Sequence, residues 1–287
     1  MTDSIQTAPL FRKVFTRYEK PAYQRFQVKG RQQITPRYVR VTLTSETFQG
    51  INFGAPDDDV RVAIPLDLDA QLGELSYQYE PEFKVIYPDD APKYEIKAYT
   101  IRRYDPELNE IDLEVALHDK GHGDYWARNC QPGQTVLVAG TWGSFDYEGQ
   151  MDHLVLFGDE TALPAISHLI EKQTWAPAIT VVAEVKNEEE RLDFTPVEGV
   201  NLAVHWLYRR DAKPGKNDVL MNGLRELIPL HTNGLYWGMG ESATMRGIRH
   251  YLGEELGVHK KALNLGGYWK REDDPEEWFY EARGDEE

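Results

Sequence analysis

Hydrophobic and polar residues alternate along several short segments in the first half of the chain. Residues 39–44 read VRVTLT, and residues 60–64 and 111–118 show the same alternation. A period of two is typical of strands that bury one face. Residues 135–140 continue the pattern, and turns rich in Gly, Pro and Asp separate these segments. The first half therefore predicts a β-sandwich or a small antiparallel β-barrel.

The pattern changes in the second half of the chain. Apolar segments at 153–158 and 179–185 predict strands that are covered on both faces, and residues 201–209 and 234–240 predict two more strands. Helical segments lie between or after these strands, at residues 161–173, 218–227 and 242–256. Alternating strands and helices predict a doubly wound parallel α/β sheet.

We expect two domains and a tail, because a length of 287 residues fits two medium domains. The expected fold class is an N-terminal antiparallel β-barrel over residues 1–150, followed by a doubly wound parallel α/β domain over residues 151–271. The boundary falls within EGQMD at 148–152. The strongly acidic tail over residues 272–287 predicts a solvated, partly helical end.

The charge balance excludes several classes of partner. The chain has 32 Lys and Arg against 48 Asp and Glu, a net charge of −16. Such a surface repels nucleic-acid backbones and anionic membranes, so we expect neither partner, and an anionic substrate needs a local basic pocket. The single cysteine, Cys130, forms no internal disulfide, and the sequence has no apolar leader, so we expect a cytoplasmic protein. Eight scattered His and one Cys predict no resident metal site.

The segment KAYTIR at 97–102 has the residue types that a flavin needs. On a strand, Lys97 and Tyr99 point to one side and Thr100 points to the other. They would place a cation near the pyrophosphate, a ring against the flavin and a hydroxyl near the flavin N5 atom. The alternative is an ordinary strand in which Lys, Tyr and Thr alternate.

Two further segments place glycines or acids before a helix. Gly121 and Gly123 precede a short helical turn and could expose backbone N–H groups to a phosphate, although a Gly-rich turn explains them equally well. FGDETALPAI at 157–166 follows a strand but lacks the GxGxxG pattern. Its Asp159 and Glu160 favour helix capping over direct contact with a pyrophosphate.

A fourth segment, WGMGESATMRGIRHYL at 237–252, again joins a strand, a glycine turn and a helix. Its Glu241 could bind a ribose hydroxyl or cap the helix. We expect Ser242 at the N-cap position.

In this order the four segments resemble the siderophore-interacting protein family, a branch of the ferredoxin-reductase-like flavoproteins. The resemblance covers about residues 15–271. Its most specific matches are AYTIR (98–102), the segment from His118 to Trp126 and Ala127, GDETALPAI (158–166), the turn from Trp237 to Glu241 with Arg246 and Arg249 on its helix, and GGYWK (266–270).

The resemblance implies a ferric-siderophore reductase with an FAD-binding barrel over 1–150 and an NAD(P)H-binding domain over 151–271. A reduced nicotinamide would reduce FAD, which would pass single electrons to Fe(III) held by a siderophore and so release the iron. The iron arrives chelated, so the chain needs no metal ligands. The donor is NADH or NADPH, with ferredoxin as an alternative, and we expect a monomer.

The resemblance also implies the cofactor contacts. Thr100 would tune flavin N5, and the cofactor-binding candidates are Lys97, Ala98, Tyr99, Thr100, His118, Gly121, Gly123, Asp124, Trp126, Ala127, Asp159, Thr161, Ala162 and Glu241. Lys97 stands where the family has Arg and loses its two-pronged phosphate contact. Asp124 near a pyrophosphate is unfavourable unless only its backbone faces the phosphates, and His122 could offset its charge.

The substrate-binding candidates are Arg61, Trp142, Lys260, Lys261, Lys270 and Arg271. Trp142 stands where the family often has a cation, which favours a less anionic siderophore such as a hydroxamate. Solvated surface cations are the alternative for the basic residues. Tyr268 and Trp269 would lie near the flavin or pack at the domain interface, and Arg209, Arg210 and Lys213 could meet a 2′-phosphate.

Two other functions stay open at this point. One is an NAD(P)H-linked flavin reductase whose acceptor is a protein or a quinone. The other is a flavin-containing siderophore-binding protein with little turnover.

Overall fold

The computed structural model describes residues 8–18, 23–46, 55, 57–70, 78–79, 85–86, 92–141, 143–228 and 230–275. The chain divides into two compact units. One unit is Thr16–Ser144, and the other combines Met1–Phe15 with Phe145–Glu287.

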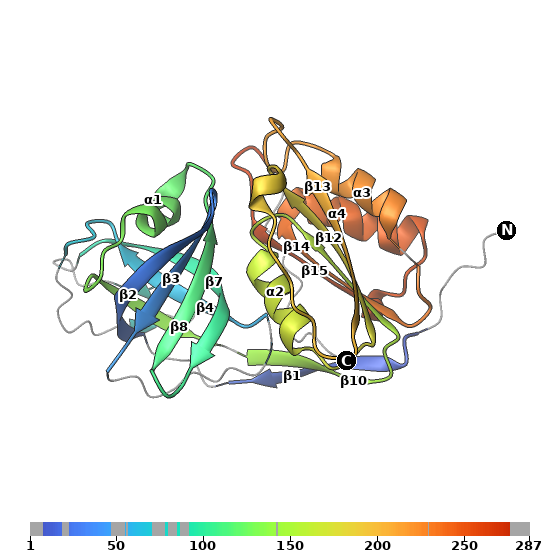
Figure 1. Ribbon diagram of the computed structural model, residues 1–287, viewed down its shortest axis with the longest axis horizontal. Helices are drawn as coiled ribbons and strands as arrows, with labels where there is room; N and C mark the ends of the chain where they lie inside the picture. Colours follow the sequence, from blue (N-terminus) through green and yellow to red (C-terminus); the bar gives the residue numbers. More distant parts are fainter. Residues whose placement is uncertain are drawn as a thin grey trace. The chain divides into compact units, whose positions relative to one another are not determined.

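The unit Thr16–Ser144 is built on a closed antiparallel β-barrel, which confirms the predicted fold of the first half (Figure 1). The order around the barrel is β2-β3-β8-β7-β4-β9. The strands are β2 (Gln24–Thr35), β3 (Tyr38–Thr44), β4 (Asp59–Pro65), β7 (Tyr94–Asp105), β8 (Glu110–Ala116) and β9 (Thr135–Gly140), with a separate short pair, β5 (Gln78–Tyr79) and β6 (Val85–Ile86).

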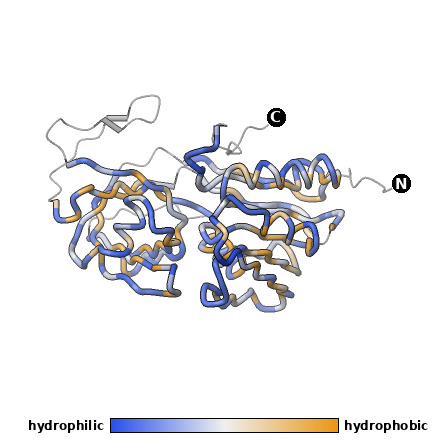
Figure 2. Tube along the Cα trace, turned by 90° about the horizontal axis from the view of Figure 1, so that it is seen from above, coloured by the Kyte–Doolittle hydropathy of each residue, from blue (hydrophilic) through white to orange (hydrophobic). Residues whose placement is uncertain are grey.

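Alternating side chains fill the barrel, and Figure 2 shows the alternation as changes of colour along its strands. Val39 and Val41 are fully buried and lie opposite Val115 and Leu113 of β8. The residues between them face outward, where the Arg40 Nη2 atom lies 2.5 Å from a Glu114 carboxylate oxygen. The period of two thus separates an apolar interior from an outer layer of ion pairs.

One helix, α1 (Gly121–Asn129), closes an end of the barrel with its apolar face. Trp126, Ala127 and the following Cys130 are each at most 1% exposed and belong to the same core as the barrel strands. Burial raises the pKa of the Cys130 thiol to about 11, so this cysteine is a packing residue.

The other unit contains a five-stranded parallel sheet in the order β13-β12-β11-β14-β15, which confirms the doubly wound fold. Figure 1 shows α2 on one face of this sheet, and α3 and α4 on the other. The strands are β11 (His153–Gly158), β12 (Ala178–Val185), β13 (Asn201–Tyr208), β14 (Gly234–Glu241) and β15 (Leu263–Trp269). The helices are α2 (Leu163–Lys172), α3 (Val219–Leu227) and α4 (Ser242–His250), with short turns η1 (Glu188–Glu190), η2 (Tyr251–Glu255) and η3 (Lys260–Ala262).

Two strands that the sequence did not predict lie within the residues 1–150 assigned to the barrel domain, and they group mainly with the α/β unit. β1 (Phe11–Arg17) pairs with β10 (Gly143–Gly149) in a separate two-stranded sheet. Specific polar contacts hold them there, because Asn233 Oδ1 accepts the N–H of Leu10 at 2.8 Å and the Asn264 amide donates to the Tyr147 hydroxyl at 2.9 Å. The barrel unit therefore ends at Ser144, before the predicted boundary at 150.

Two histidines that are far apart in the sequence meet at the start of β11. The rings of His153 and His231 stack with centroids 3.9 Å apart and planes 12° apart. Burial, followed by the charge of His231, lowers the pKa of His153 to about 4. The pair therefore packs as neutral rings at neutral pH.

Within the residues that the structure describes, no helix is both long and apolar enough to cross a membrane.

We predict that Gly238→Ala destabilises the α/β unit by about 1–3 kcal/mol, because it overpacks a rigid contact. A Cβ atom at Gly238 would lie 2.0 Å from the ring of Phe157 on the neighbouring strand, and this ring is fully buried. Urea unfolding followed by tryptophan fluorescence measures the loss.

Gly247→Ala is the matched control. Gly247 lies inside α4, and its Cβ would meet only the flexible end of Met221, at 3.4 Å. Alanine at a helix-interior position gains about 0.5–1 kcal/mol over glycine. A Gly238→Ala protein as stable as the wild type would contradict the packing argument.

Candidate functional site

The flavin segment lies on β7, next to β4. Lys97 and Tyr99 lie opposite Val62 and Val60, which are core residues of the barrel. Tyr99 packs against that core, and Thr100 projects to the opposite face of the strand and is buried. The strand thus presents Lys97 and Tyr99 on one face and the Thr100 hydroxyl on the other.

The start of α1 lies directly against these β7 side chains. A Cβ atom at Gly123 would lie 2.5 Å from the Tyr99 hydroxyl and 3.5 Å from Cγ of Lys97. The Tyr99 and Trp126 ring centroids are 6.1 Å apart. The fold therefore brings together two sequence segments that were predicted separately, and glycine is needed at 123 for them to meet.

The N-terminus of α1 has no side-chain cap. Its N-cap residue is Lys120, whose side chain accepts no backbone hydrogen bond, and Gly121 has a φ of +76°. The first N–H groups of a helix have no partner within the helix and form the positive end of its dipole. A helix start of this kind has the hydrogen-bond donors that a phosphate requires.

The Asp124 side chain reaches back to the loop just before that N-terminus. Its carboxylate accepts the N–H groups of His118 at 2.6 Å and Asp119 at 2.8 Å, and Arg128 Nε donates to it at 2.5 Å. Burial raises the pKa of Asp124, but the Arg128 hydrogen bond and the two N–H groups outweigh burial and leave it lowered. The Asp124 carboxylate thus braces the loop and is paired with Arg128.

His118 lies in the same loop as a neutral ring. Burial lowers its pKa, with Asp124 opposing the shift and Lys97 adding to it. Burial, followed by the charges of Glu95 and Asp124, raises the pKa of the Tyr99 hydroxyl. Tyr99 therefore stays protonated and can donate a hydrogen bond.

The substrate-binding candidates are distributed over both units. Arg61 lies on β4 opposite Ala98, with its Nη1 atom 2.7 Å from Asp59 Oδ2. Lys260 and Lys261 are exposed on η3, and Lys270 and Arg271 follow β15. Trp142 lies outside the described residues, and so does the acidic tail from residue 276 onward.

The carboxyl ends of the parallel strands form the second candidate site. From β11 the chain moves to β12 and β13 on one side, and then to β14 and β15 on the other. The topological switch point therefore lies between β11 and β14, which is where open α/β sheets bind ligands.

One buried carboxylate joins three loops at this switch point. Asp159 Oδ2 accepts the N–H of Glu241 at 3.1 Å and the indole N–H of Trp269 at 2.8 Å. Asp159 Oδ1 accepts the N–H of Thr161 at 2.9 Å. The ends of β11, β14 and β15 are thus bound to one side chain, which accounts for Trp269 as a packing residue of its own unit.

The predicted caps of α2 are wrong. The N-cap residue of α2 is Ala162, which has no side-chain cap, and Asp159 bonds within its own turn and to β14 and β15. Glu160 instead forms a two-pronged ion pair with Arg209, at 2.6 Å for the Nη1–Oε2 contact. The acids bind partners that are distant in the sequence, which local helix signals do not report.

The predicted cap of α4 is off by one residue. Glu241 is the N-cap residue and accepts the N–H of Thr244 at 2.8 Å. Ser242 is the first helical residue and donates to the Trp269 carbonyl at 3.0 Å. Glu241 therefore caps α4, as one of its two predicted roles requires. Its other predicted role, a contact with a ribose hydroxyl, stays a prediction.

Buried acids surround Arg209 at this edge. Its Nη1 atom also lies 4.0 Å from Glu184 Oε1. Burial, followed by the charge of Asp159, raises the pKa of Glu184 to about 7. Arg271 likewise binds its own unit, at 2.8 Å from the Gly215 carbonyl and 3.4 Å from Glu241 Oε1. Cations at this edge hold internal carboxylates.

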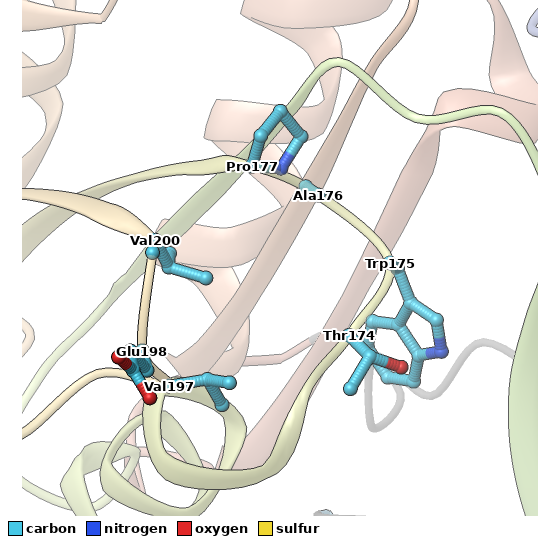
Figure 3. A pocket seen from close by; sticks show the side chains of 8 residues that line it. Thr174, Trp175, Ala176, Pro177, Val197, Glu198 and Val200 are labelled. Atoms are coloured by element: carbon cyan, nitrogen blue, oxygen red, sulfur yellow. The ribbon is translucent and has the colours of Figure 1, made fainter.

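Figure 3 shows a pocket of the α/β unit that contains none of the predicted site residues. Residues 174–177 and 197–200 line it, just before β12 and β13 begin. It therefore lies at the amino ends of the strands, opposite the ligand-binding edge.

Local signals could have found one residue that the sequence interpretation missed. Arg128 lies four residues after Asp124, the spacing of a helical ion pair. No local spacing indicates that Arg209 pairs with Glu160, because the two residues are 49 positions apart in the sequence. Within the described residues, no group of three or more His, Cys, Asp or Glu side chains is arranged to hold a metal ion.

Two sequence models of one family cover both units. The model described as "Siderophore-interacting FAD-binding domain" matches residues 27–145, and the model described as "Siderophore-interacting protein" matches residues 151–272. The chain belongs to the siderophore-interacting protein family.

Individual relatives agree with this assignment. The chain is 28% identical to the ferric vibriobactin reductase ViuB of Vibrio cholerae over 255 residues, which cover 87% of this chain and 90% of that protein. A siderophore utilization protein from T. fusca superposes with a TM-score of 0.75 at 28% identity, over 93% of this chain and 99% of that one. A ferredoxin NADP⁺ reductase from Neisseria gonorrhoeae shares the fold, with a TM-score of 0.57 at 12% identity, over 86% of this chain and 99% of that one.

We predict that Gly123→Ala weakens FAD binding about tenfold or more. The methyl group would displace the Tyr99 hydroxyl, and a clash that costs 1.4 kcal/mol already corresponds to a factor of about ten. Flavin fluorescence titration of the apoprotein measures the loss.

Gly30→Ala is the control for Gly123→Ala, because no atom lies within 4 Å of a Cβ at Gly30. The double variant Gly123→Ala with Tyr99→Phe should recover part of the loss, since the hydroxyl that clashes is removed. Unchanged FAD affinity in Gly123→Ala would show that the contact of α1 with β7 does not shape the site.

We predict that Glu184→Gln removes part of the pH dependence of stability. The pKa of Glu184 is about 7 in the folded protein, against an ordinary value of 4.5, so the folded chain holds a proton that the unfolded chain has released. The wild type therefore loses stability as pH rises from 4.5 through 7, by about 3 kcal/mol in total. Glutamine does not titrate. The free energy of unfolding of the variant should therefore rise relative to that of the wild type as the pH increases from 4.5 to 7.

Urea unfolding at pH 5, 6, 7 and 8 measures this difference. Glu226→Gln, on an exposed part of α3, is the control and should run parallel to the wild type. A Glu184→Gln curve that is also parallel to the wild type would mean that Glu184 is ionised throughout.

Proposed function

We propose that the protein is an FAD-dependent ferric-siderophore reductase that takes its electrons from NAD(P)H. One observation carries the proposal. The uncapped start of α1 lies against Lys97 and Tyr99 of β7, in a barrel whose sequence matches the siderophore-interacting FAD-binding domain. The relative named ferric vibriobactin reductase, matched over nearly its whole length, supports the choice of acceptor.

The residues of the barrel fit FAD. A pyrophosphate would bind the N–H groups at the start of α1, where Asp124 is already neutralised by Arg128. Lys97 adds positive charge beside them, and the protonated Tyr99 supplies a hydrogen-bond donor. Thr100, on the opposite face of β7, is proposed to set the environment of flavin N5.

FAD, when bound, accepts two electrons from a nicotinamide and gives them up singly. One NAD(P)H therefore reduces two ferric siderophores, yielding NAD(P)⁺, one proton and two Fe(II). Fe(II) binds siderophores more weakly than Fe(III), so reduction releases the metal. No side chain needs to act as a general acid or base, and the work of the chain is to bind and orient.

We place the nicotinamide nucleotide at the switch point between β11 and β14. Open α/β sheets bind dinucleotides at such a switch point, and Asp159 holds the three loops there in place. Arg209 and Arg210 already hold Glu160 and Glu188, so a 2′-phosphate would compete with these carboxylates. Ferredoxin as donor is an outcome that the test distinguishes.

The substrate would meet local cations on an otherwise acidic protein. Arg61, Lys260, Lys261, Lys270 and Arg271 are the proposed contacts for an anionic chelate, since a few cations focus the field where the bulk is negative. We further propose that the protein acts in the cytoplasm as a monomer, where a single buried Cys130 stays reduced.

The test is anaerobic mixing of the holoprotein with NADH or NADPH and a ferric siderophore, in the presence of an Fe(II) chelator. We expect loss of the flavin absorbance on addition of nicotinamide, then two Fe(II) complexes per nicotinamide consumed. A ferric hydroxamate should react faster than a ferric tricatecholate, and a strong tricatecholate preference would contradict the role assigned to Trp142.

The other outcomes identify what is wrong. A colourless protein that takes up no FAD would overturn the proposal. Flavin that is reduced without Fe(II) appearing would favour another acceptor or a binding protein. If ferredoxin reduces the flavin and neither NADH nor NADPH does, then ferredoxin replaces NAD(P)H as the proposed electron donor.

A further inference from the structure

Two rings stack on the first turns of α1. The centroids of His122 and Tyr125 are 6.0 Å apart, and their planes differ by 26°. Tyr125 is 54% exposed, and it is the one aromatic among the large apolar side chains that the described residues leave exposed. The two rings are stacked, and more than half of Tyr125 is exposed to solvent.

The orientation of His122 is fixed from the barrel side. Its Nε2 atom lies 2.7 Å from the carbonyl oxygen of Pro65 at the end of β4. A carbonyl oxygen only accepts, so Nε2 carries the hydrogen. In the neutral ring, Nδ1 is then a hydrogen-bond acceptor.

The ring pair adjoins the proposed phosphate site. His122 is the second residue of α1, and Tyr125 follows one turn later on the same side. The uncapped N–H groups and the exposed ring face thus lie on the same two turns of one helix. A ligand with a phosphate next to a purine matches this combination, because the phosphate suits the N–H groups and the purine suits the ring.

Leu66 adds an exposed apolar side chain next to the residue that binds His122. It follows Pro65, whose carbonyl holds His122, and it is 50% exposed. The Asp119 carboxylate in the preceding loop is already paired, since it binds Arg37 and Arg128. A neutral base therefore fits here better than a second anion.

We infer that His122 and Tyr125 form the adenine platform for FAD, with the adenine stacked on Tyr125 and its amino group donating to His122 Nδ1. This inference rests on the proposed binding of FAD by the barrel. It has a direct consequence for selectivity, because FMN has the flavin and one phosphate but no adenine. The platform should make the protein choose FAD over FMN.

The test compares FAD with FMN on apoprotein variants by flavin fluorescence titration. Stacking of a base on an aromatic ring is worth a factor of about 5–100 in affinity. Tyr125→Ala should therefore weaken FAD binding about 5- to 100-fold and leave FMN binding within twofold of the wild type. Tyr125→Phe keeps a ring and should keep the FAD affinity.

Leu108→Ala is the matched control, because Leu108 is 57% exposed in the same unit but lies in the turn between β7 and β8. It should change neither affinity. Circular dichroism spectra that coincide for all variants establish that the fold is intact.

Each contrary outcome has its own meaning. FAD affinity unchanged in Tyr125→Ala, or FAD and FMN weakened equally, would overturn the platform and leave the proposed function standing. A wild-type apoprotein that binds neither flavin would overturn the proposed function and the platform with it.

Discussion

The burial of Trp126 in the end of the barrel is the interaction on which the proposed flavin site depends. Truncating a buried aromatic of this size typically costs about 3–5 kcal/mol, enough to fix the position of a nine-residue helix. With Trp126 seated in the core, the start of α1 must lie on β7, and only glycine at 123 allows that approach. An apolar contact thus determines where the polar groups of the site stand.

The α/β unit achieves the same result with a charge. Asp159 holds the ends of three strands, and Asp124 similarly braces the loop before α1 in the barrel unit. Arg128 pairs with Asp124 itself, whereas Arg209 pairs with Glu160, the residue next to Asp159. On a chain with a net charge of −16, these two arginines are thus held by carboxylates of their own unit.

Periodicity predicted the elements whose burial alternates or is continuous, and it missed those held by other means. The alternation over 39–44 and 111–118 became β3 and β8, and the apolar run at 179–185 became β12. β15 escaped detection because LNLGGYW has two glycines and no clear period, although most of it is buried. The residues of the proposed flavin site were predicted by type, but their proximity depends on the packing of α1 against β7, which no local pattern reports.

The proposed phosphate contact would rest more on backbone than on side-chain charge. Lys97 forms an ion pair with Glu95, so its charge is partly neutralised in the absence of a ligand. Lysine also lacks the two-pronged geometry of arginine. The N–H groups at the start of α1 have neither weakness, because they are fixed in direction and no side chain caps them. Their direction is set by the packing of Trp126, so the affinity of the site for a phosphate is a property of the barrel core as much as of the residues that touch the ligand.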